Sequence, residues 1–445
     1  MSRKLNNLLR AAAALIVSAA VLCSCNGDRD HILKVYNWAD YIDEDLIGEF
    51  EEWYEEQTGE KVKIQYATFD INENMLQQIE MGHEDYDVVC PSDYIIERML
   101  RKNLLQPINK DFGQTPNYLG NVSPYVVEQF EKMGHDSNLV VNDYTIGYMW
   151  GTGGFIYNAK YVTDDEVKSW SALQNPKFAQ KIFMKDAVLD IYCMMACATN
   201  YDDIKSGKVT RDELFGNITP ERLAKIEEYL KNAKGQFCGW ETDFGKEYMT
   251  QEKAWINLSW SGDAAWAIEE AEEVGVELRY VVPEEGSNVW FDGWVIPKYA
   301  VNTKAASYFI NFMCKPENAI RNMDEIGYVS VIATPEILEY AIDSTFEETS
   351  NLAYFFGDSC NADAIHVNPV YYADQSVIDR CALEHEAGEM TEQLMEMFSH
   401  VKGDSLDSNM VAILLVVVVA IVVVIVAGVS KRKKEQERRK ARKNA

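Results

Sequence analysis

Aromatic and acidic residues occur together at four places in the sequence, each at the end of a predicted β-strand. Aromatic rings cover alkyl chains and attract ammonium groups through their faces, worth about 0.5–2 kcal/mol each. Carboxylates accept charge-assisted hydrogen bonds from ammonium groups, worth about 1.5–3 kcal/mol each. One such pair alone is better explained by a core aromatic residue beside a solvated acid, but four together predict a site for a cation that carries an alkyl chain. The residues are Trp38, Asp40 and Tyr41, then Asp93 and Tyr94, then Trp260 and Asp263, and finally Trp290 and Asp292.

Signatures of catalysis and of metal binding are missing from the sequence. It has no HExxH, no GxSxG and no phosphate loop, and its six histidines and nine cysteines form no cluster with zinc spacing. A glycosidase needs only two acids beside a sugar bond, and an acid-rich chain offers such pairs by chance, so a surface hydrolase stays as an alternative. We predict a binding protein that is not an enzyme, with no catalytic residue, no metal and no cofactor.

The charge balance favours a cationic ligand over nucleic acid. The chain has 445 residues with 71 acidic and 42 basic side chains, for a net charge of −29. Its two ends are basic, so the middle of the chain is more acidic than this total. Phosphate recognition needs a basic surface, which excludes nucleic acid as a partner of that middle region.

The middle of the chain alternates between strand and helix patterns. Short apolar strands at residues 33–38, 62–66 and 87–90 are separated by amphipathic helices, and a second region of this kind covers residues 150–289. This order is typical of an α/β fold with a parallel sheet and helices on both faces. Ligands of such sheets lie outside the carboxyl ends of the strands, where the aromatic and acidic residues occur.

The N-terminal 25 residues are typical of a secretory signal. A basic stretch and an apolar run lead to Leu22-Cys23-Ser24-Cys25, which is similar to a bacterial lipobox. We therefore predict a signal peptide with a lipobox at residues 1–25, export, and lipidation of Cys25.

The C-terminal end predicts a membrane anchor. Residues 410–430 form an uncharged run about as long as a helix needs to cross a bilayer. A polar linker at residues 401–409 precedes it, and a basic tail at residues 431–445 follows it. Because basic flanks stay in the cytoplasm, the acidic domain is expected on the periplasmic side of the inner membrane.

Six short strings give the chain a family resemblance in addition to these patterns. They span residues 33–328, in the right order and at the right spacings. With them the chain resembles the periplasmic spermidine/putrescine-binding proteins of polyamine ABC transporters. The strings are Tyr36-Asn37-Trp38-Ala39-Asp40-Tyr41, Pro91-Ser92-Asp93-Tyr94, Tyr148-Met149-Trp150-Gly151, Trp260-Ser261-Gly262-Asp263, Trp290-Phe291-Asp292 and Ile326-Gly327-Tyr328.

The resemblance implies a two-lobed periplasmic-binding-protein fold of type II. Lobe 1 would comprise residues 32–144 and 296–400, and lobe 2 residues 145–295, with crossovers at 144–158 and 292–297. The lobes would close on putrescine or spermidine, and the protein would deliver it to ABC permease subunits in the inner membrane.

The resemblance also implies roles for individual residues. In lobe 2, Asp186 matches a family acid, and Asp190 matches the next one after a one-residue insertion. Asp40 and Asp263 resemble the putrescine-preferring branch, and Gln375 is offered as a C-terminal contact. Residues matching the walls of the family site are Trp38, Tyr41, Ser92 and Tyr94 in lobe 1, Trp260 and Trp290 against the alkyl chain, Asp292 at an ammonium, and Tyr328.

Two residues depart from the family pattern. Asp93 stands where the family usually has a small hydroxyl or apolar residue, and Ala39 replaces a usual Ser or Thr.

Three alternative functions stay open. The same fold also serves binding proteins for other organic cations or for sugars, although a sugar site would use neutral amides more than clustered acids. The surface hydrolase is the third alternative.

Overall fold

The computed structural model describes residues 29–134, 139–242, 244–357 and 360–403. The chain divides into two units, residues 1–391 and residues 392–445. In the second unit only residues 392–403 are described, and they belong to helix α17 (Thr391–Gly403). All other described elements lie in the first unit.

One part of the first unit, here called lobe 1, is formed by two separate stretches of the chain and is built on a mixed sheet. Strand β1 pairs in parallel with β2 on one side and with β3 on the other, and β3 pairs with the antiparallel strand β10. The strands of this lobe are β1 (Ile32–Trp38), β2 (Lys63–Phe69), β3 (Val88–Val89), β4 (Leu105–Gln106) and β11 (Val329–Ser330). Its helices are α2 (Asp45–Thr58), α3 (Asn72–Glu80), α4 (Asp93–Arg101), α5 (Pro124–Lys132), α12 (Thr303–Met313), α13 (Pro316–Ile326), α14 (Pro335–Ala341), α15 (Ala353–Phe356) and α16 (Gln375–Ile378).

The second part, here called lobe 2, has its own parallel strands. Strand β6 pairs in parallel with β7 and with β8. The strands are β6 (Ile182–Lys185), β7 (Phe237–Glu241), β8 (Ile256–Trp260) and β9 (Leu278–Val281). The helices are α6 (Val188–Thr199), α7 (Tyr201–Lys205), α8 (Arg211–Gly216), α9 (Pro220–Ala233), α10 (Gly245–Thr250) and α11 (Ser261–Glu273).

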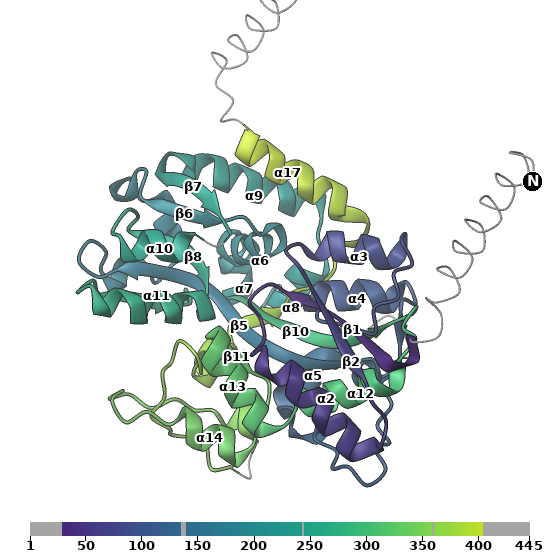
Figure 1. The fold of residues 1–445 in the computed structure, drawn as a ribbon. Helices are drawn as coiled ribbons and strands as arrows, with labels where there is room; N and C mark the ends of the chain where they lie inside the picture. Colours follow the sequence, from purple (N-terminus) through teal and green to yellow (C-terminus); the bar gives the residue numbers. More distant parts are fainter. Residues whose placement is uncertain (1–28, 135–138, 243, 358–359, 404–445) are drawn as a thin grey trace, which may run out of the picture. The chain divides into compact units, whose positions relative to one another are not determined.

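Two long strands, β5 (Thr145–Asn158) and β10 (Ser287–Pro297), connect the lobes (Figure 1). They pair with each other in antiparallel fashion, and β5 continues into lobe 2, where it pairs with β8 and β9. Every residue of both strands is buried. Strands that are covered on both faces are typically rich in apolar residues, so the polar Asn288 and Asp292 stand out in β10.

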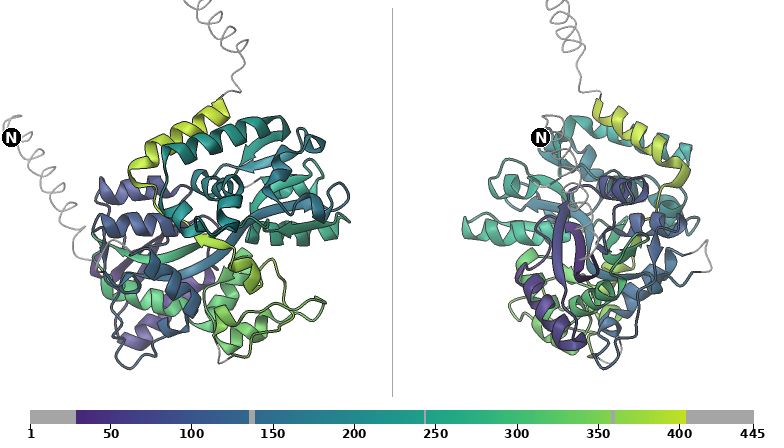
Figure 2. Two further views of the ribbon diagram at one scale, coloured as in Figure 1. Left: turned by 180° about the vertical axis from the view of Figure 1, so that it is seen from behind. Right: turned by 45° about the vertical axis from the view of Figure 1, so that its right-hand side comes forward.

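A third segment joins this central pair. Strand β12 (Cys381–Leu383) runs parallel to the first three residues of β10 and lies beside it in the view from behind (Figure 2). The polypeptide after β12 therefore reaches the place where β5 and β10 pass from one lobe to the other.

Most of the expected elements are present within a few residues of their predicted bounds. Helix α2 shows why, because its buried Leu46, Phe50 and Tyr54 recur every four residues. The helix ends where Gly59 adopts a left-handed conformation, φ 72°, and donates its N–H to the carbonyl of Glu55. The sheet is not wholly parallel, however, since β10 runs antiparallel to β3 and to β5, and β5 runs antiparallel to β8.

The predicted fold class needs one correction. The α/β architecture is as expected, but none of the described helices is both long enough and apolar enough to cross a membrane. The described residues therefore form a two-lobed α/β fold, and no membrane-spanning helix is found among them. The range proposed for that helix, 410–430, and the basic tail at 431–445 lie outside the described residues. The signal peptide and Cys25 also lie outside them and stay predictions.

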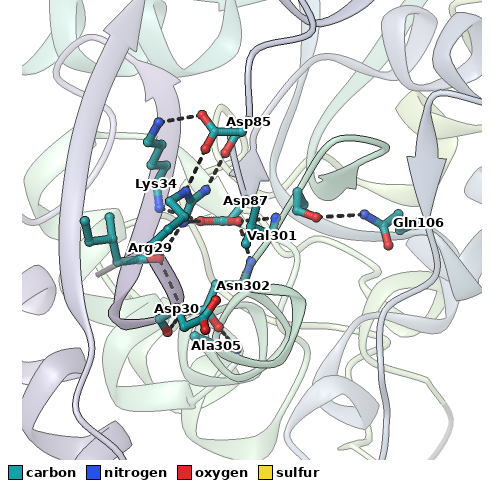
Figure 3. A network of polar contacts seen from close by, with 11 residues as sticks. Arg29, Asp30, Lys34, Asp85, Asp87, Gln106, Val301, Asn302 and Ala305 are labelled. Atoms are coloured by element: carbon teal, nitrogen blue, oxygen red, sulfur yellow. Dashed lines mark hydrogen bonds and ion pairs between the residues drawn. The ribbon is translucent and has the colours of Figure 1, made fainter. Parts of the chain in front are cut away.

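A buried carboxylate connects three elements at the amino ends of β1 and β3 (Figure 3). Asp87 is fully buried and accepts hydrogen bonds from the backbone N–H groups of Lys34, Val301 and Asn302. The guanidinium of Arg29 lies 2.9 Å from the same carboxylate. This network fixes the edge of lobe 1 opposite to the carboxyl strand ends.

The substitution Asp87→Asn tests this network. Removing the charge leaves Arg29 without its buried partner and weakens three backbone hydrogen bonds, so the free energy of unfolding should fall by about 3 kcal/mol. Urea unfolding followed by circular dichroism measures it. Asp85→Asn is the matched control, because Asp85 also pairs with Arg29 but its side chain is 34% exposed. Equal losses in the two variants would contradict the role given to Asp87.

Candidate ligand-binding site

Asp292 is the buried acid of β10, and lobe 1 holds it from two sides. The hydroxyl of Ser92 donates to Oδ1 at 2.7 Å, and the hydroxyl of Tyr41 donates to Oδ2 at 2.8 Å. A backbone bridge between Ser92 and Asp292 fixes the same contact. The predicted residues Tyr41, Ser92 and Asp292 therefore lie together.

Asp93 is buried directly beside this group. It is the first residue of α4, and its carboxylate accepts the backbone N–H of Tyr94 at 2.7 Å and that of Phe291 at 3.1 Å. The second bond ties the start of α4 to β10, next to Asp292. Asp93 thus occupies an inward position, where the family resemblance suggested a small residue.

Two further acids meet at the side chain of Asn288. Its amide nitrogen donates to Oδ1 of Asp190 at 3.0 Å and to Oε1 of Glu384 at 2.7 Å. Asp190 lies in the first turn of α6, where the positive end of the helix dipole favours a negative group. Glu384 directly follows β12. We call the four residues Asp93, Asp190, Asp292 and Glu384 the acid cluster.

The acid cluster contains negative charge that the protein leaves unbalanced. Among the residues that the structure describes, no Lys, Arg or His forms an ion pair with any of its four carboxylates. Burial and the charges of neighbouring acids raise the pKa of Asp93 and of Glu384 well above their ordinary values. Burial likewise raises the pKa of Asp190, and it raises that of Asp292 to about 6. These are the shifts expected when like charges share a dry site.

Aromatic rings lie next to the acid cluster. The ring centroids of Trp290 and Tyr328 are 5.5 Å apart, and those of Tyr41 and Tyr328 are 5.9 Å apart. The indole N–H of Trp260 donates to Asp190 at 2.8 Å, so a lobe 2 ring touches the acid cluster directly. Trp38 packs on Phe69 with 4.5 Å between centroids, inside lobe 1.

The third predicted pair, Trp260 and Asp263, belongs to a separate charge network in lobe 2. Oδ2 of Asp263 lies 3.0 Å from the ammonium of Lys185, and Oδ1 accepts the hydroxyl of Tyr328 at 3.0 Å. Lys185 also lies 3.3 Å from Glu241 and 4.2 Å from the centroid of the Trp260 ring. Asp263 is therefore neutralised by the protein itself.

Three further predicted residues are Asp186, Asp40 and Gln375, and their roles at the site stay predictions. Lys185 is the last residue of β6 and points inward, and because side chains alternate along a strand the next residue, Asp186, is exposed. Asp40 is also exposed, at φ 50° just after β1. The side-chain oxygen of Gln375 accepts a hydrogen bond from the amide of Asn351 at 3.1 Å.

Tyr94 is placed at the edge of the site. Its hydroxyl donates to Glu73 at 3.3 Å and accepts from the amide of Asn72 at 3.1 Å. The same amide donates to Ser92, so Asn72 links Tyr94 to the residues that hold Asp292. The side chain of Tyr94 thus helps to position this wall, while its backbone N–H donates to Asp93 of the acid cluster.

Sequence reasoning missed Glu384, Asn288 and Lys185. Glu384 follows a short apolar strand, which is the pattern that identified the other acids, but no aromatic residue accompanies it. Lys185 directly precedes Asp186, which the family resemblance predicts as the site residue. Asn288 carries no signal in the sequence beyond being polar in a buried strand.

Comparison with known proteins shows the family of the chain. Residues 49–349 match the family of bacterial extracellular solute-binding proteins. The chain is 26% identical to the spermidine/putrescine-binding periplasmic protein of Escherichia coli K12 over 328 residues, 73% of this chain and 84% of that protein. It is 28% identical to the putrescine-binding periplasmic protein SpuD of Pseudomonas aeruginosa over 349 residues, covering 73% and 86%.

A solved structure agrees with the two-lobed architecture. The spermidine/putrescine ABC transporter substrate-binding protein PotD of Streptococcus pneumoniae superposes with a TM-score of 0.61 at 28% identity. The match covers 84% of this chain and 98% of that one. The family match, the fold and the buried charged site between the two lobes lead to the same conclusion: the chain belongs to the family of bacterial extracellular solute-binding proteins.

Proposed function

We propose that this protein binds polyamines outside the cytoplasm, and that it captures putrescine or spermidine for an ABC importer by closure of its two lobes. The acid cluster is the observation that carries the proposal. Three buried carboxylates and the half-buried Asp190, none with a basic partner among the described residues, are costly to keep ionised without a cation. A ligand with ammonium groups supplies the missing charge, whereas a neutral sugar does not.

The rings beside the acid cluster suit the rest of such a ligand. Trp290 is 9% exposed and stands two residues before Asp292 in β10, and Tyr328 packs against its ring. Rings in this position can cover methylene groups while the carboxylates hold the ammonium groups. The relatives support the same ligand class, because they are named as spermidine/putrescine-binding or putrescine-binding proteins.

Closure is supported by contacts that cross from one lobe to the other. The hydroxyl of Tyr328, in lobe 1, donates to Asp263, in lobe 2. A ligand that is held by acids from both lobes would stabilise the arrangement in which these contacts form, in proportion to its preference for that arrangement. A micromolar dissociation constant corresponds to about −8.2 kcal/mol, which a few buried ion-paired bonds and ring contacts can provide after ordering costs.

The relatives support the proposed partner and location. The proteins from Escherichia coli and Pseudomonas aeruginosa are named as periplasmic, and the pneumococcal one is named as part of an ABC transporter. The protein would therefore work on the periplasmic side of the inner membrane and deliver its ligand to permease subunits there. In this role it is a carrier rather than an enzyme.

Calorimetric titration of the purified full chain tests the ligand class. Putrescine and spermidine should bind, and 1,4-butanediol, a neutral analogue of putrescine, should not. Asp292→Asn and Trp290→Ala should each weaken polyamine binding at least tenfold, because one removes an ammonium partner and the other a ring. Asp165→Asn is a control at an exposed surface pair and should leave the affinity unchanged. Unchanged affinity in both site variants would refute the proposed site.

The raised pKa of Asp292 predicts how putrescine affinity and the stability of the ligand-free protein change with pH. Burial raises this pKa from 3.8 to about 6, although hydrogen bonds from Ser92 and Tyr41 oppose the shift. A cation binds the ionised form, so putrescine affinity should rise as the pH increases through about 6. The stability of the ligand-free protein should show the opposite trend. The contribution of Asp292 to the free energy of unfolding is fully present below about pH 3.8 and is lost as the pH rises through about 6.

Titrations at pH 5, 6, 7 and 8, together with melting curves of the ligand-free protein, measure both trends. Amine groups stay protonated over this range, so the ligand itself does not titrate. Asp292→Asn should flatten both curves around pH 6. An affinity that stays constant from pH 5 to 8 in the unmodified protein would contradict the assignment.

Gly262 provides a test of closure. A Cβ at this position would lie 2.5 Å from two carbons of the Tyr328 ring, so Gly262→Ala should keep the lobes from forming their contact. Polyamine affinity should fall about tenfold, although alanine favours the helix α11 by about 1 kcal/mol. Gly48→Ala is the matched control, since Gly48 lies in a helix with open space around it. Equal affinities in the two variants would argue against closure at this contact.

A further inference from the structure

Lys185 places an alkylammonium group inside the lobe 2 half of the site. Its side chain is 2% exposed, and its nitrogen lies 3.0 Å from Asp263, 3.3 Å from Glu241 and 4.2 Å from the centroid of the Trp260 ring. Two carboxylates and an indole face are the surroundings that the proposed function assigns to an ammonium group of the ligand. The side chain of Lys185 thus fills a position that is chemically equivalent to a ligand site.

The charges around Lys185 are balanced within the protein. Burial would raise the pKa of Asp263, but the charges of Lys185 and of Lys246, 3.5 Å away, hold it below its ordinary value. Burial would lower the pKa of Lys185, but Asp263 and Glu241 hold it above its ordinary value. Lys185 therefore stays charged, and Asp263 has no need of a second cation.

Trp260 separates this balanced region from the acid cluster. Its ring face lies against the ammonium of Lys185, while its indole N–H donates to Asp190 in the acid cluster. Two cation positions therefore adjoin one indole ring. Lys185 occupies the first, and the second, at the acid cluster, has no basic partner among the described residues.

We propose that Lys185 is a specificity-determining residue, a built-in ammonium group that closes the Asp263 end of the site to the ligand. The ligand's own ammonium groups are then confined to the acid cluster, and a second ammonium near Trp260 meets a like charge. A compact diamine is favoured over a longer triamine. This inference rests on the proposed function, because it concerns which polyamine the same site selects.

The test compares dissociation constants for spermidine and putrescine in the full chain and in Lys185→Met. Methionine has a similar length and no charge, so Asp263 and Glu241 become available to a ligand ammonium. The ratio of spermidine affinity to putrescine affinity should rise at least tenfold. Lys160→Met is the matched control, because Lys160 also lies beside a carboxylate, Glu252, and a ring, but is exposed. Its ratio should equal that of the unmodified protein.

A second variant keeps the test possible if Lys185→Met does not fold. Lys185→Met leaves two buried acids without a cation, so the double variant Lys185→Met/Glu241→Gln removes one of them and should show the same rise in the ratio. A folded single or double variant with an unchanged ratio overturns the role of Lys185, while polyamine binding by the unmodified protein leaves the proposed function intact. Failure of the unmodified protein to bind either polyamine overturns both.

Discussion

Buried negative charge without a cation is the physical constraint on which the site depends. Each carboxylate of the acid cluster is held by donors that cannot neutralise it: backbone N–H groups for Asp93, hydroxyl groups for Asp292, and the amide of Asn288 for Asp190 and Glu384. These bonds orient the oxygens and leave the charge in place. Apolar packing elsewhere in the fold must offset the cost of burying them, so the site is organised before any ligand arrives.

The crossing strands make this arrangement possible. Asp93, Asp190, Asp292 and Glu384 are far apart in the sequence, and they meet because β10 pairs with β5, β3 and β12 along its length. Close packing requires glycine in β5, since a Cβ on Gly151 would lie 2.6 Å from the ring of Trp290. The crossover that joins the lobes therefore also assembles the site.

The sequence predicts the elements better than it predicts the directions of side chains. Short apolar runs locate β1, β2 and β3, the aromatic and acidic strand ends identify Tyr41 and Asp292, and the family resemblance adds Ser92. The choice between Lys185 and Asp186 depends on a single residue of register, and a shift of one residue reverses the face of a strand. The position of Glu384 depends on the pairing of a three-residue strand with β10, which no local pattern specifies.

The number of acids in a sequence therefore does not give the number of cations that a site accepts. Asp263 and Asp292 look equivalent in the sequence, because each lies within three residues of a tryptophan at a strand end. In the structure Asp263 shares its charge with Lys185, and separating a buried pair of this kind is costly, whereas Asp292 has only neutral donors. Burial acts to raise the pKa of both carboxyl groups, but the charges of Lys185 and Lys246 hold the pKa of Asp263 below its ordinary value, whereas the pKa of Asp292 is raised. The difference arises from the partners that the fold brings to each acid. Asp263 is paired with a lysine of the protein, whereas Asp292 remains available to a ligand.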